Sequence, residues 1–352
     1  MGRSFGAAVL TMAMLVVACS GDDDTRSADG EAAPVAPTTS TPTAVPSAGC
    51  EAGAALPEAN LVEASLDVRG AARRYLLSAP ATEAGADPLP LVLDFHGLAE
   101  GADIHAQMTQ LGPLGVEEGF ITVFPHGRGT PVGWDVHPDA AANDDLAYVA
   151  ALLDRIEQER CVDPSRVYAT GLSYGAMMSS TVACAMADRV AAVAPVAGLL
   201  LPEPCDPVRP VPVLTIHGTA DPILQFNGGI GTEVLGAALG GGQPVPTPTT
   251  TPADLDGPGY PETVRDWAAL DGCDVGSAHD ERVSDEVIRR IFDCPEEALV
   301  EFLIVEGGGH SWPGSAFSKA IERVVGPTTD ELDASEEIWS FFTGHALPAA
   351  SG

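Results

Sequence analysis

Short apolar runs recur along the chain from residue 91 onward, and longer stretches with helical periodicity separate them. The runs are Leu91–Phe95, Phe120–Phe124, Arg166–Thr170, Pro212–Ile216 and Val300–Val305. Uninterrupted hydrophobicity over so few residues is typical of central parallel strands that are covered on both faces. The helical stretches are Asp144–Gln158, with Asn143 as its N-cap, Ala176–Ala187 and Glu336–Phe342. This alternation predicts an α/β fold with a mostly parallel central sheet and helices on both faces.

Two segments depart from this pattern. Residues 61–78 alternate polar and apolar side chains, which predicts two antiparallel strands at an edge of the sheet. Residues 226–260 are rich in glycine, proline and threonine and are too polar and too interrupted for a regular element. We therefore expect a long surface excursion there.

The first 49 residues are expected to lie outside the fold. The apolar run Phe5–Val17 is too short for a membrane span and typical of a signal peptide over residues 1–18. Small residues precede Cys19, as in a bacterial lipoprotein signal, so Cys19 is the predicted lipidation site and the only expected link to a membrane. An ordinary secretory signal that contains a cysteine is the alternative. Residues 19–49 predict a disordered tether, which leaves residues 50–352 as one large catalytic domain exported from the cytoplasm.

The chain is strongly acidic, with 50 Asp and Glu residues against 17 Lys and Arg residues and a net charge of −33. A nucleic-acid-binding protein needs a basic surface that replaces phosphate counterions, so no nucleic-acid partner is expected. The acidity favours solubility and does not specify a partner.

Six cysteines remain when Cys19 is assigned to the lipid. They are Cys50, Cys161, Cys184, Cys205, Cys273 and Cys294. An even number in an exported protein predicts three disulfides, and no Cys-x-x-Cys or histidine-rich spacing indicates a metal site. We expect Cys273–Cys294 as a local loop closure and leave the other pairings open. Buried free thiols are the alternative for some of them.

The segment Gly171-Leu172-Ser173-Tyr174-Gly175 matches the pattern G-x-S-x-G. The pattern alone is a weak signal, but here it directly follows a predicted strand and directly opens a predicted helix. That context is the one required by the nucleophile elbow of the α/β-hydrolase fold, where a strained turn lifts a serine hydroxyl above the sheet. Ser173 is therefore the predicted nucleophile, and a tight turn with a capping serine is the alternative.

A serine nucleophile needs a base and a carboxylate that orients it, and in this fold they follow the serine in the order acid, then histidine. His310 lies just past the last predicted strand, in a glycine-rich loop, and is the predicted base. Asp221 follows the strand at 212–216 and is the predicted acid. The other downstream histidines fit less well, because His217 precedes the acid and is expected to pack or hydrogen-bond locally. His279, His345, Asp206 and Asp274 are weaker candidates by position.

Backbone N–H groups are expected to bind the negative charge that develops on the substrate carbonyl oxygen. His96-Gly97 ends the first parallel strand, and the N–H of Leu98 is expected to join that of Tyr174 in an oxyanion hole. The ring of His96 is expected to brace this turn. Trp134 and Trp312 lie on loops at the same edge and are predicted to line the substrate cleft, with packing of the His310 loop as the alternative for Trp312.

Several of these motifs occur together in one known group of proteins. They are His96-Gly97, Asn143-Asp144-Asp145, Cys161–Gly175, Ala194–Gly198, His217–Asp221 and Gly309–Gly314. From about residue 50 onward the chain resembles the polyhydroxybutyrate depolymerase family, which is close to the feruloyl and acetylxylan esterases of carbohydrate esterase family 1. The resemblance implies an exported esterase that acts on a polymer or on its ester-linked substituents. The 226–260 excursion and the lack of a separate substrate-binding domain depart from the pattern.

The sequence thus predicts a serine carboxylic ester hydrolase that works by two-step acyl transfer without a metal or an organic cofactor. Its partner is expected to be an ester substrate: a polyhydroxyalkanoate, a feruloylated or acetylated plant polysaccharide, or a small soluble ester. Two other classes stay open. One is a non-catalytic surface lipoprotein that only binds a ligand, and the other is a peptidase.

Overall fold

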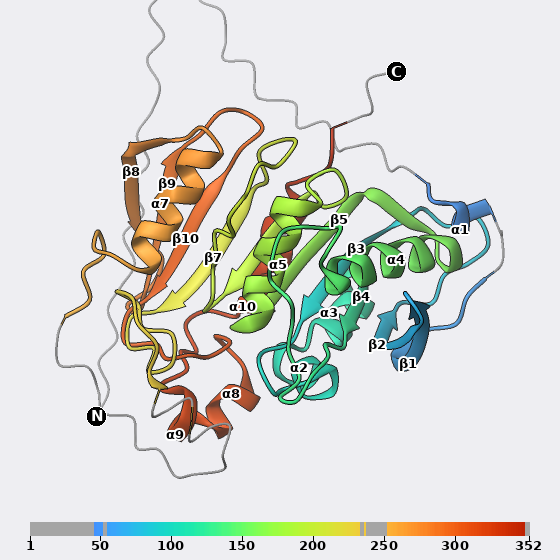
Figure 1. Cartoon of the computed structure of the whole chain (residues 1–352), viewed down its shortest axis with the longest axis horizontal. Coiled ribbons are helices and arrows are strands. Elements are labelled where there is room, and N and C mark those ends of the chain that lie inside the picture. The colour runs from blue at the N-terminus through green and yellow to red at the C-terminus, as the bar shows by residue number, and fades with distance from the viewer. Residues whose placement is uncertain (1–45, 52–54, 233–235, 237–251, 349–352) are drawn as a thin grey trace, which may run out of the picture. The chain divides into compact units, whose positions relative to one another are not determined.

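A ten-stranded sheet runs through the described part of the chain in the computed structural model (Figure 1). The structure describes residues 46–51, 55–232, 236 and 252–348. The strands are β1 (Ala59–Val68), β2 (Ala71–Ala79), β3 (Leu89–Phe95), β4 (Ile121–Pro125), β5 (Val162–Leu172), β6 (Ala192–Val196), β7 (Val213–Gly218), β8 (Asp274–Arg282), β9 (Val287–Asp293) and β10 (Val300–Val305). Their order is β1-β2-β4-β3-β5-β6-β7-β10-β9-β8. The central strands β4, β3, β5, β6, β7 and β10 are parallel to one another. The antiparallel pairs β1–β2 and β9–β8 flank them.

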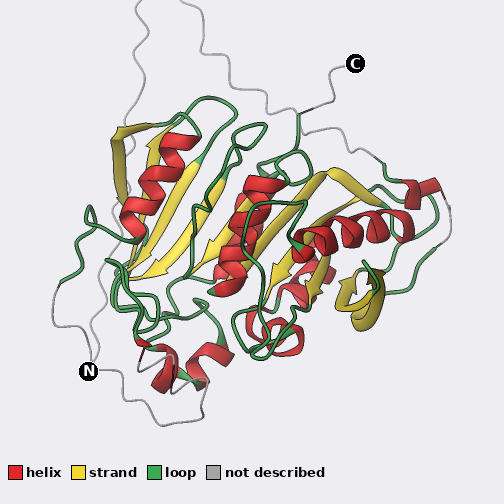
Figure 2. Ribbon diagram, viewed as in Figure 1, coloured by secondary structure: helices red, strands yellow, loops and turns green. Residues whose placement is uncertain are grey.

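Helices cover both faces of this sheet, as the sequence predicts (Figure 2). They are α1 (Ala48–Glu51), α2 (Ala102–Thr109), α3 (Leu111–Glu118), α4 (Asp144–Glu159), α5 (Tyr174–Ala185), α7 (Tyr260–Leu270), α8 (Ala316–Ala320), α9 (Glu322–Val325) and α10 (Ala334–Thr343). Side chains of β3 alternate between two cores because successive residues of a strand point to opposite faces. Leu91 belongs to the core shared with Leu152 of α4 and Met178 of α5, and Val92 to the core shared with Ile338 of α10.

The predicted strands and helices are present. The two edge strands form the β1–β2 hairpin, and the five predicted parallel strands are β3, β4, β5, β7 and β10. Asn143 caps α4, because its side chain accepts hydrogen bonds from the N–H groups of Asp145 and Leu146. The sequence missed three strands. They are β6, whose apolar run is interrupted by Pro195, β8, whose side chains are exposed almost throughout, and β9, whose apolar residues are interrupted by Arg289 and Arg290.

The folded part begins a little earlier than predicted. Ser47 is buried and its N–H donates to the carbonyl of Val162 at 2.9 Å, and helix α1 starts at Ala48. The Cys50–Cys161 disulfide fixes this segment next to the start of β5, so the tether cannot extend to residue 49 as expected. The predicted signal peptide, Cys19 and the tether up to residue 45 lie outside the described residues. Within the described ranges, no helix is long and apolar enough to cross a membrane.

All six remaining cysteines are paired. The disulfides are Cys50–Cys161, Cys184–Cys205 and Cys273–Cys294. The predicted pairing of Cys273 with Cys294 is confirmed, and it closes a loop of 21 residues that contains β8 and β9. Three disulfides are typical of a protein exported to an oxidising compartment.

Both ends of the predicted excursion at 226–260 are packed into the fold. Phe226 is 3 % exposed, and the N–H of Tyr260 donates to its carbonyl at 2.9 Å. The Asn227 side chain donates to the carbonyls of Asp254 and Pro258 and accepts from the N–H of Asp254. The excursion is therefore closed at its base, and its central part, apart from residue 236, lies outside the described residues.

Candidate active site

Ser173 lies in a strained turn between the end of β5 and the start of α5, with φ 59° and ψ −117°. A non-glycine residue with this backbone costs on the order of 1–3 kcal/mol and is held there by the surrounding structure. The flanking glycines are required by close packing, since a Cβ on Gly171 would lie 2.4 Å and one on Gly175 1.8 Å from the carbonyl oxygen of Phe95. The side chain of Ser173 is partly exposed. This is the geometry expected of a nucleophile elbow.

His310 and Asp221 form a buried pair. His310 Nδ1 donates to Asp221 Oδ2 at 2.7 Å, and the two residues are 5 % and 2 % exposed. They lie on the loops that follow β10 and β7, two neighbouring parallel strands. Both residues therefore lie at the carboxyl ends of the parallel strands, as does Ser173, which follows β5. The Nδ1 bond leaves Nε2 as the ring nitrogen that can accept a proton from a serine hydroxyl.

The surroundings of Asp221 keep it ionised. Its Oδ1 accepts the N–H groups of Ile223 and Leu224, both at 2.8 Å. Burial raises the pKa of the Asp221 carboxyl, but His310 and His217 outweigh that effect and hold the pKa well below its ordinary value. A permanent carboxylate at this position suits a group that must stabilise a protonated imidazole.

His217 also contacts the acid. Its Nε2 donates to the carbonyl of Leu224 at 2.8 Å and lies 3.2 Å from Asp221 Oδ2. The ring stacks on Tyr260, with centroids 3.7 Å apart. The expectation that His217 packs and hydrogen-bonds locally is confirmed, and its contact with Asp221 was not foreseen.

In the described part of the chain, the turn after β3 leaves one backbone amide free of protein acceptors. Gly97 N donates to Glu100 Oε2 at 2.6 Å and Ala99 N donates to the carbonyl of Val132 at 2.8 Å. Within the described residues, the N–H of Leu98 between them has no acceptor, and neither has the N–H of Tyr174 at the start of α5. These are the two amides that the sequence assigns to an oxyanion hole, and that role stays a prediction.

The ring of His96 braces the same turn. Its Nδ1 donates to the carbonyl of Gly97 at 2.7 Å and its Nε2 accepts the N–H of Gly127 at 2.9 Å. Burial lowers the pKa of His96 to about 4, so the ring is neutral at neutral pH and can use one nitrogen as donor and the other as acceptor.

A cavity of about 590 Å³ lies beside the elbow. It is lined by Trp134, Asp135, Val136, His137, Pro138, Tyr174, Leu200, Leu201, Pro202 and Glu203. Trp134 contributes to its wall. This residue is only 4 % exposed, and its Nε1 donates to the carbonyl of His96 at 2.8 Å. Asn143 holds the loop that carries these residues by donating to the carbonyls of Asp135 and His137.

Trp312 does not line this cavity, and its place in the substrate cleft stays a prediction. It is 1 % exposed, its Nε1 donates to Ser335 Oγ at 3.0 Å, and its ring packs edge-on against His105. The alternative reading, in which Trp312 packs the loop of His310, agrees with this burial.

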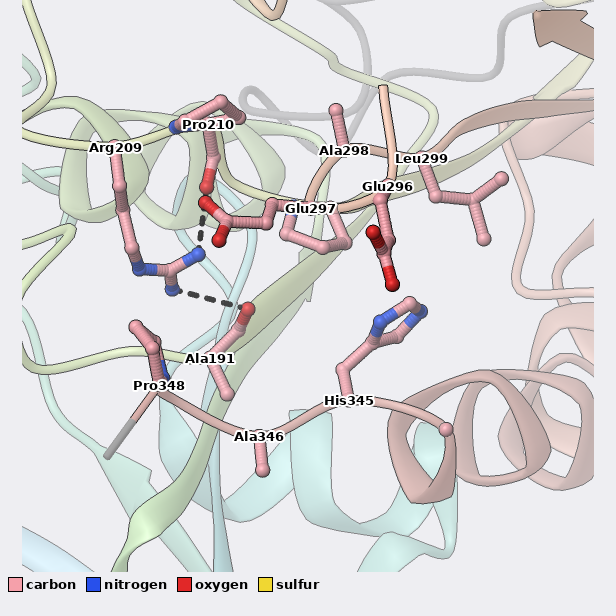
Figure 3. A pocket seen from close by; sticks show the side chains of 12 residues that line it. Ala191, Arg209, Pro210, Glu296, Glu297, Ala298, Leu299, His345, Ala346 and Pro348 are labelled. Atoms are coloured by element: carbon pink, nitrogen blue, oxygen red, sulfur yellow. Dashed lines mark hydrogen bonds between the residues drawn. The ribbon is translucent and has the colours of Figure 1, made fainter. Parts of the chain in front are cut away.

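A second cavity, of about 390 Å³, lies at the opposite edge of the sheet, where β6, β7 and β10 begin (Figure 3). The Arg209 guanidinium on its wall donates to the carbonyls of Pro210 and Ala191. Burial lowers the pKa of His345 to about 4, so this side chain is neutral. The guanidinium on this wall is satisfied by backbone carbonyls, and this edge lies away from Ser173. In the described part of the chain, no cluster of three or more His, Cys, Asp or Glu side chains has a metal-binding arrangement.

The fold and the position of the elbow define the class of this protein, an α/β-hydrolase-fold protein with a serine at the nucleophile elbow. Residues 73–234 match the family described as Esterase PHB depolymerase. The putative esterase NocK of Nocardia uniformis subsp. tsuyamanensis is 31% identical over 353 residues, which cover 95% of this chain and 97% of that protein. The chain therefore belongs to the esterase PHB depolymerase family, and the resemblance seen in the sequence is confirmed.

One further relative is a longer protein than this chain. Feruloyl esterase B of Piromyces equi is 28% identical over 246 residues, which are 68% of this chain but only 42% of that protein. This chain thus matches less than half the length of that relative. Among solved structures, an acetyl xylan esterase from Aspergillus awamori superimposes with a TM-score of 0.50 at 15% identity, covering 75% of this chain and 98% of that one. At this identity the similarity shows a common fold.

Proposed function

We propose that this protein is an exported serine esterase in which Ser173, His310 and Asp221 cleave carboxylic esters of a polymer or of its substituents. One observation carries the proposal. A buried His310–Asp221 pair, with 2.7 Å between Nδ1 and Oδ2, lies on loops at the sheet edge that also bears the strained serine turn.

In the first step, Ser173 Oγ attacks the ester carbonyl carbon while His310 Nε2 takes the hydroxyl proton. The carbonyl oxygen becomes an oxyanion within reach of the N–H groups of Leu98 and Tyr174. Collapse of this intermediate breaks the bond to the leaving alcohol, which receives the proton from His310. The acyl group is then bound to Ser173 as an ester.

In the second step, water attacks the acyl carbon and His310 Nε2 takes its proton. Collapse releases the carboxylic acid and returns the proton to Ser173 Oγ, so the enzyme is regenerated. Asp221 stabilises the protonated imidazole in both steps and stays ionised itself, in keeping with its lowered pKa.

Replacing Ser173 by alanine tests the nucleophile. We expect Ser173→Ala to lower kcat for p-nitrophenyl acetate by at least about 10⁴-fold, because no other group replaces the attacking oxygen. The melting temperature should change little, since the side chain is partly exposed and makes no hydrogen bond within the described residues. Ser340→Ala, at an exposed position of α10, is the matched control. Full turnover by the Ser173 variant would exclude this nucleophile, and absence of turnover by the wild type would favour a ligand-binding protein.

The substrate class follows from a comparison of rates. A hydroxybutyrate oligomer, methyl ferulate, p-nitrophenyl acetate and a peptide anilide should be assayed side by side. The family favours the oligomer, and the names of the feruloyl and acetylxylan esterases among the relatives favour the aromatic ester as the second candidate. Preferred turnover of the anilide would contradict the assignment as an esterase.

We further propose that Cys19 carries a lipid that anchors the exported enzyme to the cell envelope. The small residues before this cysteine support the proposal. Cys19→Ser should move the enzyme from the membrane fraction to the soluble fraction. An unchanged distribution would leave an ordinary secretory signal as the better explanation.

A further inference from the structure

A chain of buried polar contacts supports the turn that contains Leu98. Asp94, near the end of β3, accepts from His105 Nε2 at 2.7 Å and from Thr109 Oγ1 at 2.7 Å. His105 Nδ1 lies 3.2 Å from Glu100 Oε1, and Glu100 Oε2 accepts the N–H of Gly97 at 2.6 Å. This network of side chains thus connects β3 and α2 with the first amide of the turn.

Glu100 also closes the turn at residues 97–100. Glu100 N donates to the carbonyl of Gly97 at 3.3 Å, so residues 97–100 form a tight turn that Glu100 closes twice, through backbone and side chain. With the amides of Gly97 and Ala99 occupied, the peptide between them presents the N–H of Leu98 without an acceptor in the described part of the chain. A Cβ placed on Gly97 would lie 2.9 Å from Glu100 Oε2 and 3.7 Å from the Cβ of Ser173, so the carboxylate lies close to the elbow.

A buried histidine lies between the two carboxylates of this network. Asp94 and His105 are fully buried, and the Glu100 side chain is 10 % exposed. Burial lowers the pKa of His105, but the charges of Asp94 and Glu100 outweigh it and raise the pKa to about 10. His105 is therefore protonated at neutral pH and keeps Glu100 from acting as an isolated anion beside the position where an oxyanion would form.

The same histidine connects to the loop of the predicted base. The Trp312 ring packs edge-on against the His105 ring, with 6.0 Å between centroids. Trp312 is two residues from His310, and Ser335 Oγ, which accepts from its Nε1, donates in turn to the carbonyl of Thr109. One buried network thus contacts both the turn at residues 97–100 and the loop of His310.

We propose that Glu100 is a positioning residue for the oxyanion hole. Its carboxylate, held by His105 and Asp94, takes the N–H of Gly97 and so directs the N–H of Leu98 toward the substrate oxygen. This inference rests on the proposed esterase function. It adds a group that contacts no substrate and acts through the backbone of the turn.

Three substitutions at Glu100 separate the acceptor from the charge. Glu100→Gln keeps an oxygen that can accept from Gly97 and an amide that can donate to a neutral His105, whose Nε2 still donates to Asp94. Glu100→Asp keeps the charge but is one methylene too short to reach both partners. Glu100→Ala removes the acceptor and leaves the turn without its side-chain closure.

The expected order of kcat for p-nitrophenyl acetate is wild type, then Gln, then Asp, then Ala. The Gln variant should stay within about threefold of wild type. The Ala variant should lose roughly 10- to 100-fold in kcat with KM nearly unchanged, since an oxyanion contact is made in the transition state and complete loss of such a donor costs about 10²–10³-fold. Glu118→Ala, at an exposed position of α3, is the matched control.

Two results would overturn the proposal: an Ala variant with wild-type kcat, or a Gln variant that loses more kcat than the Asp variant. If the Ala variant does not fold, the comparison of Gln with Asp still decides between acceptor and charge. A wild-type enzyme without esterase turnover would instead refute the proposed function, so the two failures are distinguishable.

Discussion

Replacing Asp221 by asparagine removes one charge from the candidate site and leaves its shape almost unchanged. Asp221 Oδ1 accepts the N–H groups of Ile223 and Leu224, so the asparagine must place its carbonyl oxygen at that position. Its NH₂ group then takes the position of Oδ2 and faces His310 Nδ1, which lies 2.7 Å away in the wild type.

An NH₂ group can only donate, so the histidine must present an unprotonated Nδ1 and carry its proton on Nε2. Nε2 is the nitrogen that should receive the proton of Ser173, and in this tautomer it cannot accept one. The variant also lacks the carboxylate that stabilises the imidazolium. Such a replacement lowers kcat by about 10⁴-fold in a serine hydrolase, which is about 5.5 kcal/mol of activation free energy. We expect a loss of about 10³- to 10⁴-fold here, with KM changed little.

Initial rates with p-nitrophenyl acetate measure kcat and KM for the wild type and for Asp221→Asn, and calorimetry shows whether both are folded. Asp154→Asn serves as the control, because this aspartate of α4 is 57% exposed and pairs only with a surface arginine. An Asp221 variant that is folded and keeps more than a tenth of the wild-type kcat would refute the role of Asp221 as the orienting acid.

Two further predictions concern stability. Gly175→Ala places a Cβ 1.8 Å from the carbonyl oxygen of Phe95, so we expect the free energy of unfolding to fall by about 3 kcal/mol in urea denaturation and kcat to fall at least tenfold. Gly344→Ala is the control, because its Cβ would have its nearest contact at 3.4 Å, and equal stability of the two variants would contradict the packing. Burial raises the pKa of Asp271 to about 7, so the folded state keeps a proton that the unfolded chain releases near pH 4, and stability falls as the pH rises between these values. Asp271→Asn should therefore match the wild-type melting temperature at pH 4 and exceed it at pH 8, whereas a difference independent of pH would contradict the shifted pKa.

The site could be located from the sequence because chemistry and chain order restrict it. Ser173 follows a strand and precedes a helix, and Asp221 and His310 each follow a later apolar strand. Parallel strands end at one edge of a sheet, so the three residues were expected there, and the 2.7 Å contact between His310 and Asp221 agrees with that. The substitutions Ser173→Ala and Asp221→Asn test their catalytic roles.

The supporting groups could not be foreseen in the same way. Asp94 stands in an apolar strand and was passed over, although a buried carboxylate needs partners. Its partners His105 and Thr109 come from helix α2, which has no distinct apolar stripe in the sequence. The burial of Trp312 likewise depends on His105 and on Ser335, which is 23 residues away along the chain.

The sequence by itself determined the alternation of strands and helices, the cap of α4 and the candidate nucleophile, acid and base. These features depend on local periodicity and on residue types in a fixed order, which a single chain displays directly. Only the tertiary structure decided which amide of the turn at 97–100 stays free, where Trp312 points and which cysteines pair besides Cys273 and Cys294. Each of these depends on contacts between segments that are remote along the chain, and the distance between such segments is set only when the sheet has formed.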